Sequence, residues 1–230
     1  MSADPPVPHP RSAPRRRRWF RTRALAGALG PAAFATAWVF GTARQHGRDG
    51  YTVQVEQISG LAAPDARHPT AMTAGFLVHG ACTWVFASAL EDALGGPGAA
   101  GWAPRLTRLG AVGIVGAGLL RRDRMLLVDL DGGENQSRQN DFHDAASAVA
   151  FTSLFAAPFA LARRLRRDPD LRTFATAEIA ATIVAAGVLV VFQSKRYPQY
   201  NGILQRLAVT LPMLPSAALA LRLARRRSPS

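Results

Sequence analysis

Long stretches without charged side chains alternate with short arginine-rich clusters along this chain of 230 residues. A helix rises about 1.5 Å per residue, so roughly 20 apolar residues cross a hydrocarbon core about 30 Å thick. Five runs come close to or reach this length with at most one acidic or basic side chain each: residues 24–43, 70–90, 145–162, 173–192 and 203–221. This segregation is typical of a chain that crosses a lipid bilayer several times.

A sixth apolar run is shorter than the others. Residues 109–120 approach membrane length only when the run is extended back to Trp102, which brings in Arg105 and Arg108. Arginine side chains near the end of a span can snorkel to the headgroups. A buried soluble helix is the alternative for so short a run. We predict a sixth span at residues 102–120, and therefore an all-α bundle of six transmembrane helices.

The basic residues predict how the spans are oriented. With the N-terminus in the cytoplasm, 18 of the 28 Lys and Arg residues lie in cytoplasmic segments and nine in outer segments. An excess of basic residues marks the cytoplasmic side of a membrane protein, which is the positive-inside rule. We therefore expect both termini in the cytoplasm of a bacterial cell. The membrane domain is expected at residues 24–222, between a Pro-rich, disordered basic tail at 1–23 and a basic tail at 223–230.

The net charge of +13 and the run Arg15 to Arg18 would also suit a nucleic-acid binder. A basic run directly before a span is instead typical of a topological anchor or of a contact with anionic lipid. Membrane lipids, and not nucleic acid, are therefore the expected partners. The single cysteine, Cys82, excludes an intrachain disulfide and a cysteine-based zinc site. We predict no metal and no cofactor.

Glycines and prolines within the spans predict how the helices pack. Gly110, Gly113, Gly116 and Gly118 follow a GxxGxxGxG spacing inside an apolar segment, which favours close helix packing over a dinucleotide loop. Prolines also occur inside the spans, where each removes a backbone donor and bends the helix. Bent helices make an internal cavity more probable. These prolines are Pro31, Pro158, Pro212 and Pro215.

Ionisable side chains occur within three of the apolar runs: His79, Glu178 and, near the outer end of the last span, Arg206, which can snorkel outward or pair with an acid. Placing one in hydrocarbon costs roughly 2.5–3.5 kcal/mol, so each needs a reason to be there. His79, near the middle of the second span, can be neutral and hydrogen-bonded to a neighbouring helix. Glu178, near the cytoplasmic end of the fifth, can be a protonated or snorkelling acid. Alternatively, His79 and Glu178 could relay protons or ions in a small transporter.

A second group of polar residues falls at the outer membrane boundary in the predicted topology. Its members are Ser59, Asp123, His143, Asp144 and Arg206. Their common depth predicts a site that binds a lipid headgroup or a small polar ligand. His143 and Asp144 also suit the capping of a helix start, where a carboxylate is favoured.

A membrane-embedded hydrolase or transferase is the alternative function for the same residues. His143 with Asp144 or Asp123 would be its catalytic group, with Ser59 as a candidate nucleophile and a metal ion as a further option. The chain has no HxxxH, HExxH or GxSxG pattern. Binding is therefore expected rather than catalysis.

Several short motifs follow one another along the chain in a defined order. An Ile-Ser-x-Leu element lies in QISGLAAPDARHP (Gln57 to Pro69), the third span ends near an acid in LLRRD (Asp123), and a His-Asp pair opens FHDAASAVAF. The arginine-rich turn ARRLRRDPD and the opening of the last span, GILQRL (Gly202 to Arg206), follow. Across about residues 24–222 this order resembles the bacterial six-span membrane proteins of family DUF998.

The resemblance implies the six-span architecture but no established reaction. It also implies a shared role for Ser59, Asp123, His143, Asp144 and Arg206. The chain departs from the family pattern at three places. Gly60 and Gln205 stand where acids are expected, and RRD replaces a Phe-Pro-x-Asp turn. The loss of two carboxylates puts acid-dependent chemistry in doubt for this chain.

Overall fold

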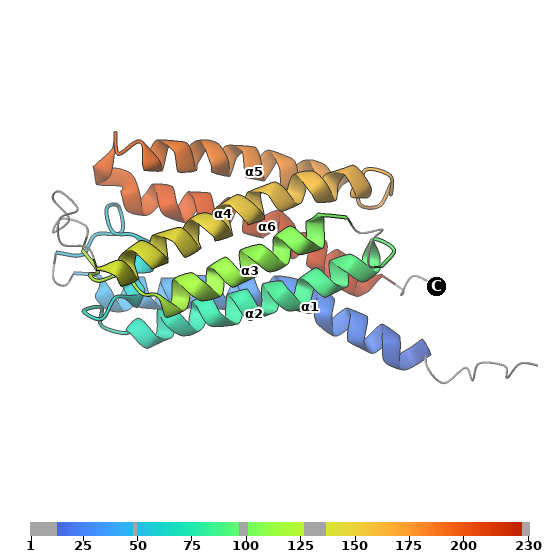
Figure 1. The fold of residues 1–230 in the computed structure, drawn as a ribbon, viewed down its shortest axis with the longest axis horizontal. Helices are drawn as coiled ribbons and strands as arrows, with labels where there is room; N and C mark the ends of the chain where they lie inside the picture. The colour runs from blue at the N-terminus through green and yellow to red at the C-terminus, as the bar shows by residue number, and fades with distance from the viewer. Residues whose placement is uncertain (1–12, 48–49, 97–100, 127–136, 227–230) are drawn as a thin grey trace, which may run out of the picture.

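The computed structural model describes residues 13–47, 50–96, 101–126 and 137–226. These residues form six α-helices and two short 3-10 helices, and no strand occurs among them (Figure 1). In chain order the elements are α1 (Ala13–Gln45), η2 (Ile58–Ala62), α2 (Pro69–Ala93), α3 (Ala103–Leu119), α4 (Arg138–Leu165), α5 (Arg172–Gln193), η3 (Pro198–Tyr200) and α6 (Asn201–Arg225). The predicted all-α bundle is confirmed.

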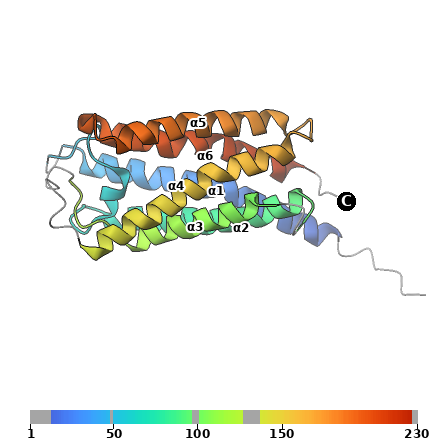
Figure 2. The same cartoon turned by 45° about the horizontal axis from the view of Figure 1, so that its top comes forward.

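The six α-helices run up and down along the long axis of the molecule and form a closed ring. Each packs against the next in the chain, and α6 also packs against α1 (Figure 2). The start of α1 and the end of α6 lie at the same end of the bundle, which we call the termini end (Figure 1). The opposite end, the loop end, holds η2, the segment after α3 and the turn between α5 and α6.

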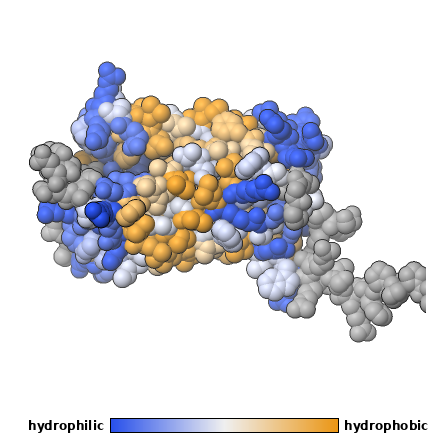
Figure 3. Space-filling model, in the orientation of Figure 1, coloured by the Kyte–Doolittle hydropathy of each residue, from blue (hydrophilic) through white to orange (hydrophobic). Residues whose placement is uncertain are grey.

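Five helices are long and apolar enough to cross a membrane: those within residues 18–45, 69–93, 138–165, 172–193 and 198–225. They coincide with five of the predicted spans. The remaining helix, α3, has 17 residues, which corresponds to about 25 Å. It packs between α2 and α4 within the same ring. On the face that Figure 3 shows, apolar residues cover the middle of the molecule and polar residues gather at both ends.

Two helices, α1 and α4, begin well before the predicted spans. α1 begins at Ala13, so the helix includes residues 13–23, which their composition had assigned to a disordered tail. Residues 1–12 and 227–230 lie outside the described residues. α4 begins at Arg138, where the N-cap Ser137 accepts a hydrogen bond from the Asn140 amide at 3.3 Å. Arginine counts against burial in hydrocarbon but not against helix formation, because its intrinsic helix propensity is high.

The glycines of α3 bring its neighbours into close contact, as their spacing predicts. A Cβ atom at Gly113 would lie 2.5 Å from Ala150 N and 2.7 Å from Ala146 O, both backbone atoms of α4. Gly110 faces the side chain of Leu154 in α4, and Gly118 faces the side chain of Phe76 in α2. The lack of side chains at these glycines therefore lets the short helix pack closely against both neighbours.

Ion pairs connect the helices at the termini end. Arg23 of α1 lies 2.7 Å from Asp92 of α2, and Arg226 lies 2.7 Å from Asp168 in the turn between α4 and α5. The hydrogen bond from Arg226 lowers the pKa of Asp168 below its usual value. Arg108 pairs with Glu91 at 2.5 Å. The predicted snorkelling of Arg108 is therefore replaced by an ion pair between α3 and α2.

Candidate functional site

Arg206 joins α6 to the loop between α1 and α2. It lies in the second turn of α6, and only 7% of it is exposed. Its terminal nitrogens lie within hydrogen-bond distance of five oxygens: Glu56 O (2.7 Å), Gly202 O (2.9 Å), Val53 O (3.1 Å), Tyr51 Oη (2.9 Å) and Thr42 Oγ1 (3.4 Å). The guanidinium also lies 5.7 Å from the centre of the Trp38 ring. The arginine thus fastens the outer loop onto two helices.

A second buried arginine, Arg122, follows the end of α3. It donates a hydrogen bond to the Gln57 side chain. Burial lowers the pKa of Arg122, while the nearby carboxylates of Asp144, Glu56 and Asp123 act in the opposite direction. The buried Glu56 side chain also lies within electrostatic range of Arg206. Glu56 therefore connects the two arginines electrostatically.

Side-chain amides complete these contacts. Gln205 accepts a hydrogen bond from the Ile58 amide at 2.6 Å and lies 3.4 Å from the Gln57 oxygen. Ser59 is buried, and its hydroxyl lies 3.4 Å from the same oxygen. We call this set the loop-end network; its members are Glu56, Gln57, Ser59, Arg122, Gln205 and Arg206.

The remaining predicted site residues have structural partners of their own. His143 Nδ1 lies 2.9 Å from Ala117 O and 2.8 Å from Leu120 O, so the histidine caps the end of α3 rather than the start of its own helix. Asp144 is exposed and accepts a hydrogen bond from Asn140 at 3.3 Å.

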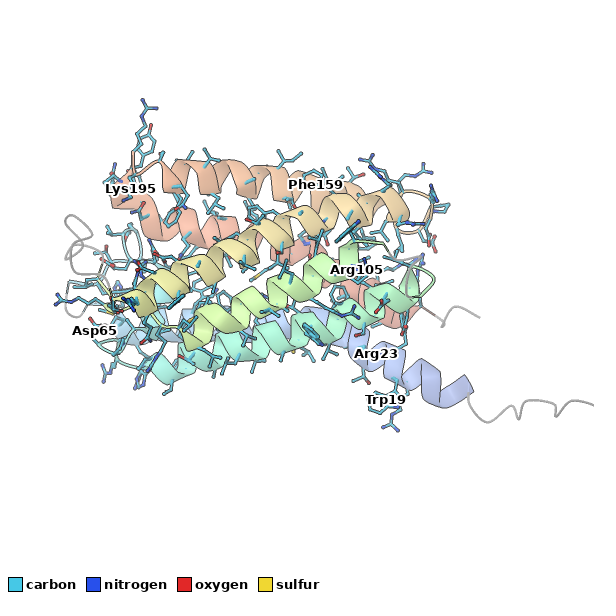
Figure 4. The ribbon with its side chains drawn as sticks, viewed as in Figure 1. Trp19, Arg23, Asp65, Arg105, Phe159 and Lys195 are labelled. Carbon is cyan, nitrogen blue, oxygen red and sulfur yellow. The ribbon has the colours of Figure 1, made fainter. Side chains whose placement is uncertain are left out.

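Asp123 fixes the start of α4. Its carboxylate accepts hydrogen bonds from the Ser137 amide at 2.7 Å and the Ser137 hydroxyl at 2.5 Å. The hydroxyl bond is the main reason that the pKa of Asp123 lies below its usual value. In the loop between α1 and α2, Asp65 accepts a hydrogen bond from the Met125 amide at 2.9 Å. Asp65 lies at the loop end (Figure 4), and the α1–α2 loop is thereby attached to the segment after α3.

The departure from the family pattern at Gly60 has a steric explanation. A Cβ atom at Gly60 would lie 2.5 Å from the Met125 carbonyl oxygen. A glutamate at this position would therefore collide with the backbone of the neighbouring segment unless that segment moved.

The predicted outer cluster is thus divided into two groups. Arg122 lies close to Asp123, His143 and Asp144, as its electrostatic influence on them shows. None of the hydrogen bonds of Arg206 in the described structure reaches these three residues. Sequence reasoning missed Arg122 and Glu56. The LLRRD motif contained a signal for Arg122, because this arginine directly precedes Asp123. The charge of Arg122 had been used only to predict the topology.

Within the part of the chain that the structure describes, no group of three or more His, Cys, Asp or Glu side chains is arranged to hold a metal ion. Ser59 and His143 have separate hydrogen-bond partners, on Gln57 and on the carbonyls of α3. Neither contact aligns the serine with the histidine as a nucleophile and its base.

A cavity of about 170 Å³ lies at the centre of the helix ring. Residues from all six α-helices line it, and most of them are apolar or aromatic. Pro31, Pro158 and Pro212 are among them, so three of the four prolines within the spans border the cavity. Its polar lining consists of His79, Thr83, Thr107, Ser147, Glu178 and Ser216.

The two ionisable residues that line the cavity lie on helices that are not neighbours in the ring. Glu178 of α5 is only 2% exposed, and Ser216 Oγ of α6 lies 2.9 Å and 3.1 Å from its two carboxyl oxygens. His79 of α2 is also buried, with Nδ1 3.5 Å from the Thr83 hydroxyl and its ring 5.4 Å from that of Phe34. The cavity is therefore an apolar chamber with a few polar groups on opposite walls.

Comparison with known proteins gives one family match. The sequence profile described as "Protein of unknown function (DUF998)" matches residues 28–222. No curated protein and no solved structure matches the chain.

Proposed function

We propose that this chain, which belongs to the DUF998 family, is a six-span protein of the bacterial cytoplasmic membrane that binds a small, mainly apolar ligand between its helices. The central cavity carries this proposal, because all six helices contribute to its walls. An apolar cavity of about 150 Å³ can hold a molecule the size of benzene. A ring compound, a short aliphatic chain or the end of a lipid tail would fit the observed volume.

The contacts at the loop end favour the cavity over the outer cluster as the ligand site. The terminal nitrogens of Arg206 already contact protein oxygens, so this arginine has little capacity left for a headgroup. The loop-end network is better explained as the fastening of the outer loop. Because Ser59 and His143 are engaged separately, binding is favoured over hydrolysis.

Transport of the same ligand is the second candidate function. The presence of two ionisable groups, His79 and Glu178, on opposite walls of one cavity favours it. Ionisable residues inside membrane domains often mark pathways for ions or substrates. Uptake of a labelled ligand into proteoliposomes would distinguish transport from binding.

Single-cysteine labelling tests the proposed topology. In a Cys82→Ser background, we expect a membrane-impermeant maleimide to label Lys195→Cys in intact spheroplasts and Asp170→Cys only after permeabilisation. Both positions are exposed, Lys195 at the loop end and Asp170 in the turn between α4 and α5. If α3 did not cross the membrane, the two labelling patterns would be exchanged, which would contradict the six-span proposal.

Ligand-observed fluorine NMR tests the cavity. We expect 4-fluorotoluene to bind the purified protein and Met213→Trp to weaken this binding at least tenfold, because the indole would fill space at the cavity wall. The matched control is Leu214→Trp, at a position that is 63% exposed on the same helix. Equal binding by the wild type and Met213→Trp, after subtraction of the signal from empty micelles, would count against the cavity as the site.

A further inference from the structure

Glu178 gives the cavity an acidic group without a basic partner. In the described ranges, no Lys, Arg or His side chain forms an ion pair with it. Its hydrogen-bond donor is the Ser216 hydroxyl, which lies close to both carboxyl oxygens. The ion pairs at the termini end are partly exposed, whereas this carboxyl group is buried.

The surroundings of Glu178 do not supply the missing charge. The other ionisable side chain that lines the cavity is His79, which belongs to a helix that does not adjoin α5 in the ring. A charged carboxylate is costly to bury unless it is paired and hydrogen-bonded. A neutral hydroxyl satisfies only part of this requirement. A ligand that carries a positive charge would complete it through a charge-assisted hydrogen bond.

Aromatic side chains suit the same kind of ligand. Phe34, Phe76, Phe86, Phe151 and Phe155 all line the cavity. An ammonium group is attracted to the face of an aromatic ring within about 6 Å, and the attraction is stronger where water is excluded. The apolar part of a ligand would pack against the same rings.

We propose that the ligand of this cavity is a small amine with an apolar body, held by an ion pair between its ammonium group and Glu178. The inference rests on the proposed function, since it names the class of ligand for the same cavity. The volume of about 170 Å³ limits the ligand to roughly one ring and a short substituent. Ser216 orients the carboxylate, and the phenylalanines receive the apolar body.

Three related probes test the charge of the ligand separately from its shape. They are 4-fluorobenzylamine, its neutral analogue 4-fluorobenzyl alcohol, and 4-fluorotoluene. The wild type should bind the amine at least tenfold more tightly than the alcohol. Glu178→Gln should remove this preference and leave 4-fluorotoluene binding unchanged, because the amide keeps the shape but not the charge. Asp170→Asn is the matched control: it makes the corresponding change at an exposed acid and should leave amine binding unchanged.

The outcomes separate the two proposals. Failure of the wild type to bind 4-fluorotoluene would overturn the proposed function itself. Binding of 4-fluorotoluene without any preference of the wild type for the amine over the alcohol would overturn only the assignment of an amine. Because this comparison uses the unmodified chain, it decides the question even if Glu178→Gln does not fold.

Discussion

Replacing Arg206 with leucine is expected to lower the free energy of unfolding by about 3–5 kcal/mol, because several buried oxygens lose a charged hydrogen-bond donor. The substitution removes the donor that connects α6 with Thr42 of α1 and with the carbonyls of Val53 and Glu56. It also leaves the buried Glu56 side chain without the nearby charge of this arginine. The outer loop should detach from α6 before the helices separate.

Unfolding in mixed micelles with increasing dodecyl sulfate measures this loss, and protease sensitivity of residues 50–68 reports on the loop. Arg206→Lys should retain part of the stability, because the ammonium keeps the charge but cannot reach the five oxygens together. Arg196→Leu, at an exposed position in the preceding turn, is the control. A change of less than about 1 kcal/mol in Arg206→Leu would contradict the fastening role, since a single hydrogen bond to a charged group contributes about 1.5–3 kcal/mol.

Replacing Gly113 with leucine should separate α3 from α4. Because a Cβ atom at this position already approaches two backbone atoms of α4, a rotamer change of a neighbouring side chain cannot relieve the collision. We expect a loss of about 3 kcal/mol, at the upper end of the range for overpacked cores. Binding in the cavity should be lost with it, because both helices line the cavity.

Gly187→Leu is the matched control for Gly113→Leu. Gly187 lies within α5, and a Cβ atom there would meet no other atom within 4 Å. Leucine has the higher helix propensity, so this variant should be as stable as the wild type or slightly more stable. The same mixed-micelle titration compares the two variants. Equal stability of both would show that close contact of α3 with α4 is not needed for the fold.

The spans could be predicted because the sequence pattern that defines them is local. Length, hydropathy and small-residue spacing indicated α1, α2, α4, α5 and α6, and the glycines of α3 indicated a packed helix where apolar length alone was insufficient. The helix ends could not be predicted as well. Hydropathy marks the residue at which charged side chains begin. The helix continues past that residue for as long as its backbone groups find hydrogen-bond partners or a capping side chain.

The candidate site depended on contacts between distant parts of the chain. Arg206 was singled out because an ionisable side chain is costly within a span, but most of its partners lie about 150 positions away, and no local pattern identifies them. Arg122 and Glu56 belong to loops where charged residues are common, so their burial could not be predicted, although the LLRRD motif places Arg122 next to Asp123. Glu178 and His79 were noted from their place in apolar runs, but their position on one cavity depends on how the six helices close into a ring.

The two ends of the bundle are held by different kinds of electrostatic contact. The pairs at the termini end, such as Arg23 with Asp92, are partly exposed, whereas the arginines of the loop-end network are buried. Dissolved ions weaken exposed pairs much more than buried ones. Rising ionic strength is therefore expected to loosen the contacts between helices at the termini end, while the contacts at the loop end persist.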